Sequence, residues 1–478
     1  MKIHVVNSGE TLHAIGRLYG IAPGLIARYN GLREPYRLAV GQSLLILRPL
    51  LTYTVRPGDS LYAIGQRFGV SVRELWQNNP NLSGGTHIYP GQVLVIRLEA
   101  ARTRPLAVSG YAYPFVRVPT LRGILPDASY LAPFTYGITA EGGLVPLDDG
   151  ALLALAREYG AEPLLHLSTL TEDGGFSARR AAQVLLDPEK AEALIEQTAA
   201  VMTEKGYRGV DVDFEYLGAE LAGAYADFVG ALRQAVRRRG GFVIAALAPK
   251  TSAAQRGALY EGHDYRKLAA AADFVLVMAY EWGYTYGPPM AVAPLDAVRR
   301  VIEYAVREMP PEKIILGFPN YAYDWTLPYR AGASRAELLG NEAAAELAVR
   351  VGAEIAYDET AQTPHFRYTG ADGREYTLVF DDRAAVSPFG NDDFASVSGV
   401  TGIQDEDGNV IAFDGYDARI DYRKDENGQK TLEAIWLSKD RLYGLAAEDG
   451  TVLMEPSVGF QKFESYGREL PRFFILPS

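Results

Sequence analysis

The sequence has no cysteine among its 478 residues. Disulfide bonds, zinc sites built on thiolates and cysteine nucleophiles are therefore excluded. The six histidines are scattered and form no His-Glu-x-x-His pattern. Nothing in the sequence nominates a metal site, and we expect neither a metal nor a cofactor.

Long apolar runs are also missing, since no stretch approaches the roughly 18 residues needed to span a bilayer. The opening residues, MKIHVVNSGETLHAIG, lack the apolar core of a signal peptide. We therefore expect no signal peptide and no membrane insertion.

The net charge of −12 argues against a nucleic-acid partner, because phosphate backbones are anionic. A composition of 48% hydrophobic and 22% charged residues is typical of globular domains, and the length predicts two to four of them.

At its start the chain carries one pattern twice. Residues 5–30 match residues 54–79 at a constant offset of 49, with turn glycines and apolar positions repeating together. Each copy predicts a strand, two helices and a final strand. The first helix of each copy is expected to begin after a capping residue (Thr11 or Ser60) and to end at a glycine (Gly20 or Gly69).

This repeat resembles the LysM domain, which implies binding of N-acetylglucosamine-containing glycans such as peptidoglycan or chitin. We expect LysM domains at 1–49 and 50–98 and a linker at 99–108. The modules should add avidity on a polymeric surface without changing the chemistry. The alternative is a small fold used only for protein contacts.

From residue 109 onward, seven short apolar runs alternate with amphipathic helical stretches. This alternation predicts an α/β fold, with a (β/α)8 TIM barrel over residues 109–383. The predicted strands are Ser109–Tyr113, Ser129–Tyr136, Pro163–Thr169, Gly209–Glu215, Phe242–Pro249, Phe274–Tyr280 and Ile314–Asn320.

One predicted strand, GVDVDFE, carries acids at every second position: Asp211, Asp213 and Glu215. In an extended chain these three side chains share one face, and catalytic groups of such barrels lie at the carboxyl ends of strands. We therefore expect Asp211, Asp213 and Glu215 to climb the barrel interior toward its mouth. A buried acid network that merely holds the barrel together is the alternative.

The acidic run resembles the Asp-x-x-Asp-x-Asp-x-Glu motif of glycoside hydrolase family 18, with Arg208 in place of the first acid. Met278-Ala-Tyr280-Glu281 is similar to the family's Met-x-Tyr followed by an acid or amide. The segments ALAPK (246–250) and GFPNYAYDW (317–325) resemble a subgroup of LysM-bearing glucosaminidases that act on spore cortex.

Cleaving a glycosidic bond requires an acid for the leaving oxygen and a nucleophile at the anomeric carbon. Glu215, nearest the mouth, is the expected acid, because a neighbouring carboxylate raises its pKa. No second carboxylate is evidently placed as nucleophile. The resemblance implies that the 2-acetamido carbonyl of the sugar attacks instead, with Asp213 orienting the acetamido N–H and Tyr280 bonding its carbonyl oxygen. Asp211 is expected to anchor Asp213.

Further candidates for substrate binding lie at or beyond strand ends. Glu281 could contact sugar or form a salt bridge, and any single aromatic ring could stack on a pyranose or simply pack. The full set is Met278, Glu281, Tyr111, Tyr136, Trp282, Tyr321 and Trp325.

Residues 384–478 are expected to be rich in β-structure. GIQDEDGNVIAF (402–413) and GLAAEDGTVLMEP (444–456) match at an offset of 42, and Asp-Gly within each predicts a hairpin. The pattern resembles the WG (KWG) β-repeat. The segment TLEAIWLS (431–438), with Trp436, is the one candidate for a closing barrel strand. Either the barrel closes there or its last unit has been replaced.

These features together predict a monomeric N-acetylglucosaminidase that cleaves peptidoglycan of the spore cortex by substrate-assisted, retaining catalysis. Muramic δ-lactam of cortex cannot supply the nucleophile, because its nitrogen is tied in a ring. We expect association with the spore coat, cortex or cell wall. The alternatives are a glycan-binding spore surface protein with an inactive barrel, and a chitinase.

Overall fold

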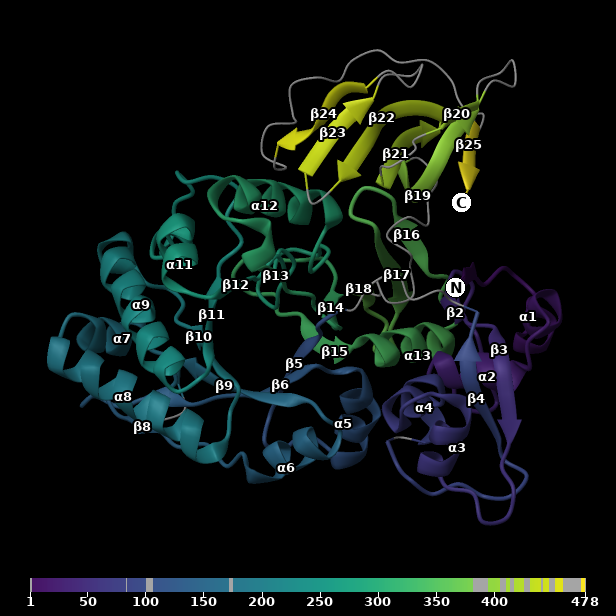
Figure 1. Cartoon of the computed structure of the whole chain (residues 1–478), viewed down its shortest axis with the longest axis horizontal. Helices are drawn as coiled ribbons and strands as arrows, with labels where there is room; N and C mark the ends of the chain where they lie inside the picture. Colours follow the sequence, from purple (N-terminus) through teal and green to yellow (C-terminus); the bar gives the residue numbers. More distant parts are fainter. Residues whose placement is uncertain are drawn as a thin grey trace. The chain divides into compact units, whose positions relative to one another are not determined.

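The computed structural model describes residues 2–82, 84–99, 106–171 and 175–380, together with the strands of a C-terminal unit (Figure 1). The chain divides into two compact units, Met1–Asp382 and Arg383–Ser478. In these described ranges no helix combines the length and the apolar character needed to cross a bilayer.

The two N-terminal repeats fold as predicted, each with a two-stranded antiparallel sheet and two helices between its strands. The first repeat contains β1 (Lys2–Val5), α1 (Leu12–Tyr19), α2 (Pro23–Tyr29) and β2 (Ser43–Ile46). The second contains β3 (Pro49–Thr54), α3 (Leu61–Phe68), α4 (Val72–Asn78), η1 (Pro80–Leu82) and β4 (Val93–Leu98).

The repeated residues explain why both copies adopt this fold. Thr11 and Ser60 accept a hydrogen bond from the backbone N–H three residues on, and Gly20 and Gly69 end the same helices in the left-handed conformation. An asparagine after each second helix then exchanges two hydrogen bonds with the final strand. Asn30 pairs in this way with Leu45 (2.7 and 2.9 Å), and Asn79 pairs with Val95 (both 2.8 Å).

All seven strands predicted from residue 109 onward are present, and neighbouring strands are parallel. Their order is β13-β12-β11-β10-β9-β6-β5. The strands are β5 (Ser109–Ala112), β6 (Tyr130–Pro133), β9 (Glu162–Ser168), β10 (Gly209–Asp213), β11 (Phe242–Leu247), β12 (Phe274–Val277) and β13 (Ile314–Leu316).

Helices follow the strands and cover the outer side of the curled sheet (Figure 1). They are α5 (Val118–Ile124), α6 (Gly150–Glu158), α7 (Ala178–Leu185), α8 (Pro188–Lys205), α9 (Ala222–Arg238), α10 (Ala258–Glu261), α11 (Tyr265–Ala271) and α12 (Leu295–Glu308). A large core lies between sheet and helices, and a smaller one, including Leu164, Ile244 and Leu276, lines the inner side. Within the described residues, β5 and β13 are free edges, so the sheet is a TIM-like half-barrel.

After β13 the chain builds an antiparallel sheet in the order β15-β14-β18-β17-β16. We call β14 to β18 with α13 the insertion sheet. Its elements are β14 (Tyr321–Thr326), β15 (Glu337–Gly340), α13 (Asn341–Val351), β16 (Ala356–Asp358), β17 (Thr363–Thr369) and β18 (Glu375–Phe380).

The C-terminal unit is β-rich, as predicted. Its antiparallel sheet contains β19 (Phe394–Gln404), β20 (Val410–Ala412), β21 (Asp417–Lys424), β22 (Lys430–Lys439), β23 (Leu442–Ala446), β24 (Val452–Val458) and β25 (Phe474–Pro477). The strands flanking both Asp-Gly sites pair as hairpins, β19 with β20 and β23 with β24. Strand β22, which contains Trp436, pairs with β21 and β23 and therefore belongs to this sheet rather than to the half-barrel. The turns on which the WG-repeat interpretation depends (405–409 and 447–451) lie outside the described residues.

The first repeat is docked on the insertion sheet through its loop 38–41. The Ile355 N–H donates to the Val40 carbonyl oxygen at 2.9 Å. Ala39 is 5% exposed and belongs to the core formed by α13 and β18, and Arg33 pairs with Glu342 at 3.3 Å. Gly41 touches the backbone of Ile355 so closely that a Cβ at this position would run into that carbonyl group.

The second repeat is docked on the half-barrel through helix α4 instead. Arg73 donates to the carbonyl oxygens of Pro126 (2.8 Å) and Ala128 (2.6 Å), at the start of the sheet. The rings of Trp76 and Tyr159 lie 5.1 Å apart. The first unit therefore holds its two repeats directly against the insertion sheet and the half-barrel.

Gly41 and its equivalent Gly91 test this docking. Both have positive φ (82° and 88°), so a Cβ strains both backbones by about 1–2 kcal/mol. Only at Gly41 does it also meet another element; at Gly91 nothing lies within 4 Å. We expect Gly41→Ala to speed hydrogen exchange of the Ile355 amide about tenfold or more, since each 1.4 kcal/mol of lost protection is tenfold. Gly91→Ala should leave that amide unchanged. Equal exchange in the two variants, measured by mass spectrometry, would contradict the docking.

Candidate active site

Strand β10 separates apolar from acidic side chains, as its alternation predicts. Val210, Val212 and the following Phe214 are fully buried in the core between sheet and helices. Asp211 and Asp213 point to the opposite side. The apolar side fixes the register of the strand, because a slip by one residue would place the carboxylates among the helices.

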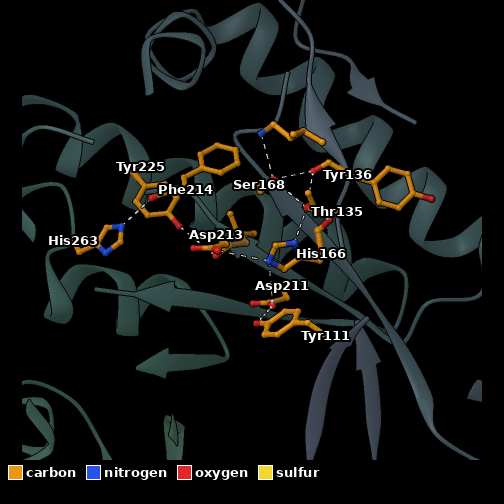
Figure 2. A network of polar contacts seen from close by, with 12 residues as sticks. Tyr111, Thr135, Tyr136, His166, Ser168, Asp211, Asp213, Phe214, Tyr225 and His263 are labelled. Atoms are coloured by element: carbon orange, nitrogen blue, oxygen red, sulfur yellow. Dashed lines mark hydrogen bonds and ion pairs between the residues drawn. The ribbon is translucent and has the colours of Figure 1, made fainter. Parts of the chain in front are cut away.

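Asp211 is deeply buried and is contacted by residues of two other strands, Tyr111 of β5 and His166 of β9 (Figure 2). The Tyr111 hydroxyl donates to Asp211 Oδ2 at 2.6 Å, and His166 Nε2 lies 3.9 Å from the same oxygen. Burial raises the pKa of Asp211, while the charge of His166 and the hydrogen bond from Tyr111 act in the opposite direction. Asp211 is 2% exposed, so its carboxylate is enclosed by these neighbours.

His166 also connects Asp211 with Asp213. Its Nε2 lies 3.8 Å from Asp213 Oδ2, and its Nδ1 lies 2.6 Å from the Thr135 hydroxyl oxygen. The other oxygen of Asp213, Oδ1, is buried and has no hydrogen-bond partner among the described residues. An unpaired buried acceptor is costly, which makes this oxygen a ready acceptor for a substrate N–H.

Glu215 follows the end of β10 and is half-buried. Burial, together with the negative charges of Asp213 and Glu281, raises the pKa of Glu215 to about 8. The carboxyl group is therefore protonated at neutral pH, as a general acid must be before it donates.

Tyr280 and Glu281 follow strand β12. Burial, with the charges of Asp213 and Glu215 added, raises the pKa of Tyr280, so that its hydroxyl remains a donor. Glu281 has φ of 63°, in the left-handed region that side chains rarely adopt. Its carboxylate accepts hydrogen bonds from the hydroxyls of Tyr321 and Tyr323, the latter at 3.2 Å. The insertion sheet thus reaches the site through β14.

Two of the candidate rings are buried, so of the two alternatives, stacking or packing, the packing alternative applies to them. Tyr136 is 2% exposed, and its hydroxyl donates to Asp149 Oδ2 at 2.5 Å. Trp325 is fully buried, and its indole N–H donates to the Gly287 carbonyl oxygen at 2.9 Å. Neither ring has a free face for a sugar.

The other candidates lie closer to the acids. Met278 is 8% exposed in the inner core, and Trp282 is half-buried against the helix-side core. Tyr111 and Tyr321 bind carboxylates of the site through their hydroxyls. Their contribution to sugar binding stays a prediction.

The sequence interpretation did not single out His166, Thr135 or Tyr323. A signal existed for His166, since it shares one strand face with Leu164, which lines the inner core. A polar side chain on that face of a barrel strand points to the interior.

The sequence of the chain is similar to those of known protein families and of individual enzymes. The sequence profile of glycosyl hydrolases family 18 matches residues 169–402, and that of the LysM domain matches residues 4–47 and 53–97. A cortical fragment-lytic enzyme of Bacillus subtilis is 36% identical over 394 residues, which cover 81% of this chain and 90% of that protein. The chain belongs to glycosyl hydrolase family 18.

Other members of the family are similar over the same length. A putative sporulation-specific glycosylase of Bacillus subtilis, YdhD, is 32% identical over 81% of this chain and 91% of its own. The crystal structure of the spore cortex-lytic enzyme SleL of Bacillus megaterium superimposes with a TM-score of 0.66 at 33% identity. That match covers 80% of this chain and 89% of the other. As a family 18 member with two LysM domains, the chain is a glycoside hydrolase.

The raised pKa of Glu215 predicts the basic limb of the pH–rate profile. Only the protonated acid can donate, so kcat/KM should fall as the pH rises through about 8. Glu281→Gln removes one of the negative neighbours and should move this limb to lower pH. Burial, the larger cause, remains, so the limb should stay above the ordinary glutamate range. Glu220→Gln, an exposed control five residues beyond Glu215, should leave the limb in place. An unchanged limb in Glu281→Gln would contradict the electrostatic coupling.

Proposed function

We propose that this chain hydrolyses spore cortex peptidoglycan, cleaving the β-1,4 bond after N-acetylglucosamine. The observation that carries the proposal is the combination of Glu215, whose pKa burial and Asp213 raise to about 8, with a buried oxygen of Asp213 that has no partner among the described residues. The similarity to cortical fragment-lytic enzymes along 90% of their length supports cortex as the substrate. The geometry favours an enzyme over an inactive glycan binder.

In the proposed mechanism, Glu215 protonates the glycosidic oxygen as its bond to the anomeric carbon breaks. The acetamido carbonyl oxygen of the sugar attacks the opposite face of that carbon and forms an oxazolinium intermediate. Asp213 Oδ1 accepts the acetamido N–H, and the Tyr280 hydroxyl bonds the carbonyl oxygen. Water then opens the ring, with the Glu215 carboxylate as base, so the β-configuration is retained.

The residues beneath the reacting pair hold Asp213 in place. Asp211 and His166 bracket its carboxylate from β10 and β9, and Tyr111 fixes Asp211. Because Asp213 must keep one oxygen free, its other oxygen is the one oriented by His166. We assign Asp211, His166 and Tyr111 as positioning residues.

The acetamido nucleophile also restricts the bond that is cleaved. Cortex contains muramic δ-lactam, whose nitrogen is tied in a ring, so cleavage is expected after glucosamine units. Chitin satisfies the same requirement and is the second candidate substrate. The LysM domains would bring the enzyme to the cell wall or cortex, and a WG-like C-terminal unit would add no catalytic group.

Glu215→Gln tests the acid directly. The amide keeps the shape but has no proton to donate, so turnover of cortex fragments should fall about 10²–10⁴-fold. Binding to insoluble cortex should persist. Glu220→Gln is the matched control and should retain wild-type turnover. Near wild-type hydrolysis by Glu215→Gln, followed by mass spectrometry of released muropeptides, would reject the assignment.

Chemically de-N-acetylated glycan tests the origin of the nucleophile. Without the acetamido carbonyl, cleavage should stop even where the glycan still binds. A thiazoline mimic of the cyclised intermediate should inhibit, because stable analogues of high-energy states bind tightly. Rapid NMR of the new reducing end should show the β-anomer. Brisk cleavage of the de-acetylated glycan, or an inverted product, would assign this role to a protein carboxylate or an activated water.

A further inference from the structure

The two LysM domains differ in what covers the loop before their final strand. In the first, loop 38–41 is occupied by the insertion sheet, through the Ile355 hydrogen bond and the burial of Ala39. In the second, the equivalent loop 88–91 is open: the Tyr89 side chain is 69% exposed, and Gly91 has free space beside it. Sequence repetition therefore does not make the two domains equivalent.

The open loop borders a cleft of about 1310 Å³ between the two domains. The second domain contributes the polar residues Asn81, His87, Tyr89 and Gln92, and the first contributes Gly24, Arg28 and Arg48. The domains are fastened to each other beside it, since the Tyr29 hydroxyl donates to the Asn78 carbonyl oxygen at 2.7 Å. Both walls of the cleft are thus parts of one fixed arrangement.

The chemistry of the cleft suits a glycan that carries carboxylates. An exposed tyrosine ring such as Tyr89 can pack on the apolar face of a sugar. Arg48 is already engaged, with Nη2 donating to the Tyr19 carbonyl oxygen at 2.7 Å. Arg28 is exposed and makes no ion pair within the part of the chain that the structure describes. A free guanidinium binds carboxylates in a bidentate manner.

We propose that the LysM pair carries one composite glycan site, in the cleft between the domains, rather than two equivalent sites. Tyr89 supplies the stacking surface, and Arg28, from the other domain, selects N-acetylglucosamine polymers whose substituents bear carboxylates, as in peptidoglycan, over neutral chitin. The inference rests on the proposed targeting role of the LysM domains. In this proposal the first domain docks on the insertion sheet and also forms one wall of the glycan site.

The test uses full-length protein carrying Glu215→Gln, so that bound glycan is not degraded, and compares capture by insoluble peptidoglycan and by chitin. Tyr89→Ala should weaken capture by both polymers about tenfold. Arg28→Ala should weaken capture by peptidoglycan about tenfold, the effect of losing a charged hydrogen bond, and leave chitin unchanged. Arg17→Ala is the control, since Arg17 lies exposed on the same domain but does not line the cleft. It should change neither.

Three outcomes would overturn the composite site. Arg17→Ala could match Arg28→Ala, which would show unspecific charge attraction. Gly41→Ala could reduce capture as strongly as Tyr89→Ala, which would make the loop of the first domain a binding site. Tyr89→Ala could leave capture intact. Cleavage of soluble muropeptides by the same variants without Glu215→Gln separates these failures from failure of the hydrolase proposal, because soluble fragments need no capture.

Discussion

Three acidic residues, Asp211, Asp213 and Glu215, occupy every second position along strand β10 and its end. The other polar residues of the site are arranged around their negative charge. Carboxylates so close together in a poorly solvated site cannot all stay ionised without support. Asp211 receives the hydroxyl of Tyr111 and the imidazole of His166. Among the described residues Glu215 has no such hydrogen-bond partner, and burial raises its pKa to about 8. The three acids therefore differ in the polar partners that surround them, and only Glu215 has its pKa raised to about 8.

Much of this arrangement could be read from local sequence. Helix caps, left-handed glycines and the period of two along β10 are short-range properties, so the repeats, the seven parallel strands and the direction of the acids were predicted correctly. The direction of a ring beyond a strand end is set by packing instead. Tyr136 and Trp325 found buried carbonyl or carboxylate partners, which no spacing rule reveals.

Contacts between segments that lie far apart in the chain could not be predicted from the sequence either. Val40 meets Ile355, more than three hundred residues later, and the carboxylate of Glu281 is held by tyrosines of a sheet that had been assigned to the barrel as a whole. Nothing in the VGQ or PGQ motifs distinguishes a docked loop from an open one. Only the partner surface does, and that surface is created by the fold.

The docking of Ala39 limits how the repeats can be exchanged. A second copy of the Tyr89-containing domain, grafted in place of the first, would bring a tyrosine to a position that is 5% exposed and enclosed by the core of α13 and β18. The reverse graft would place an alanine where a ring stands free. Although the two domains share one sequence pattern, each one suits only its own position in the chain. Exchanging them would disrupt the contact of the first domain with the insertion sheet and would remove the exposed ring from the second domain.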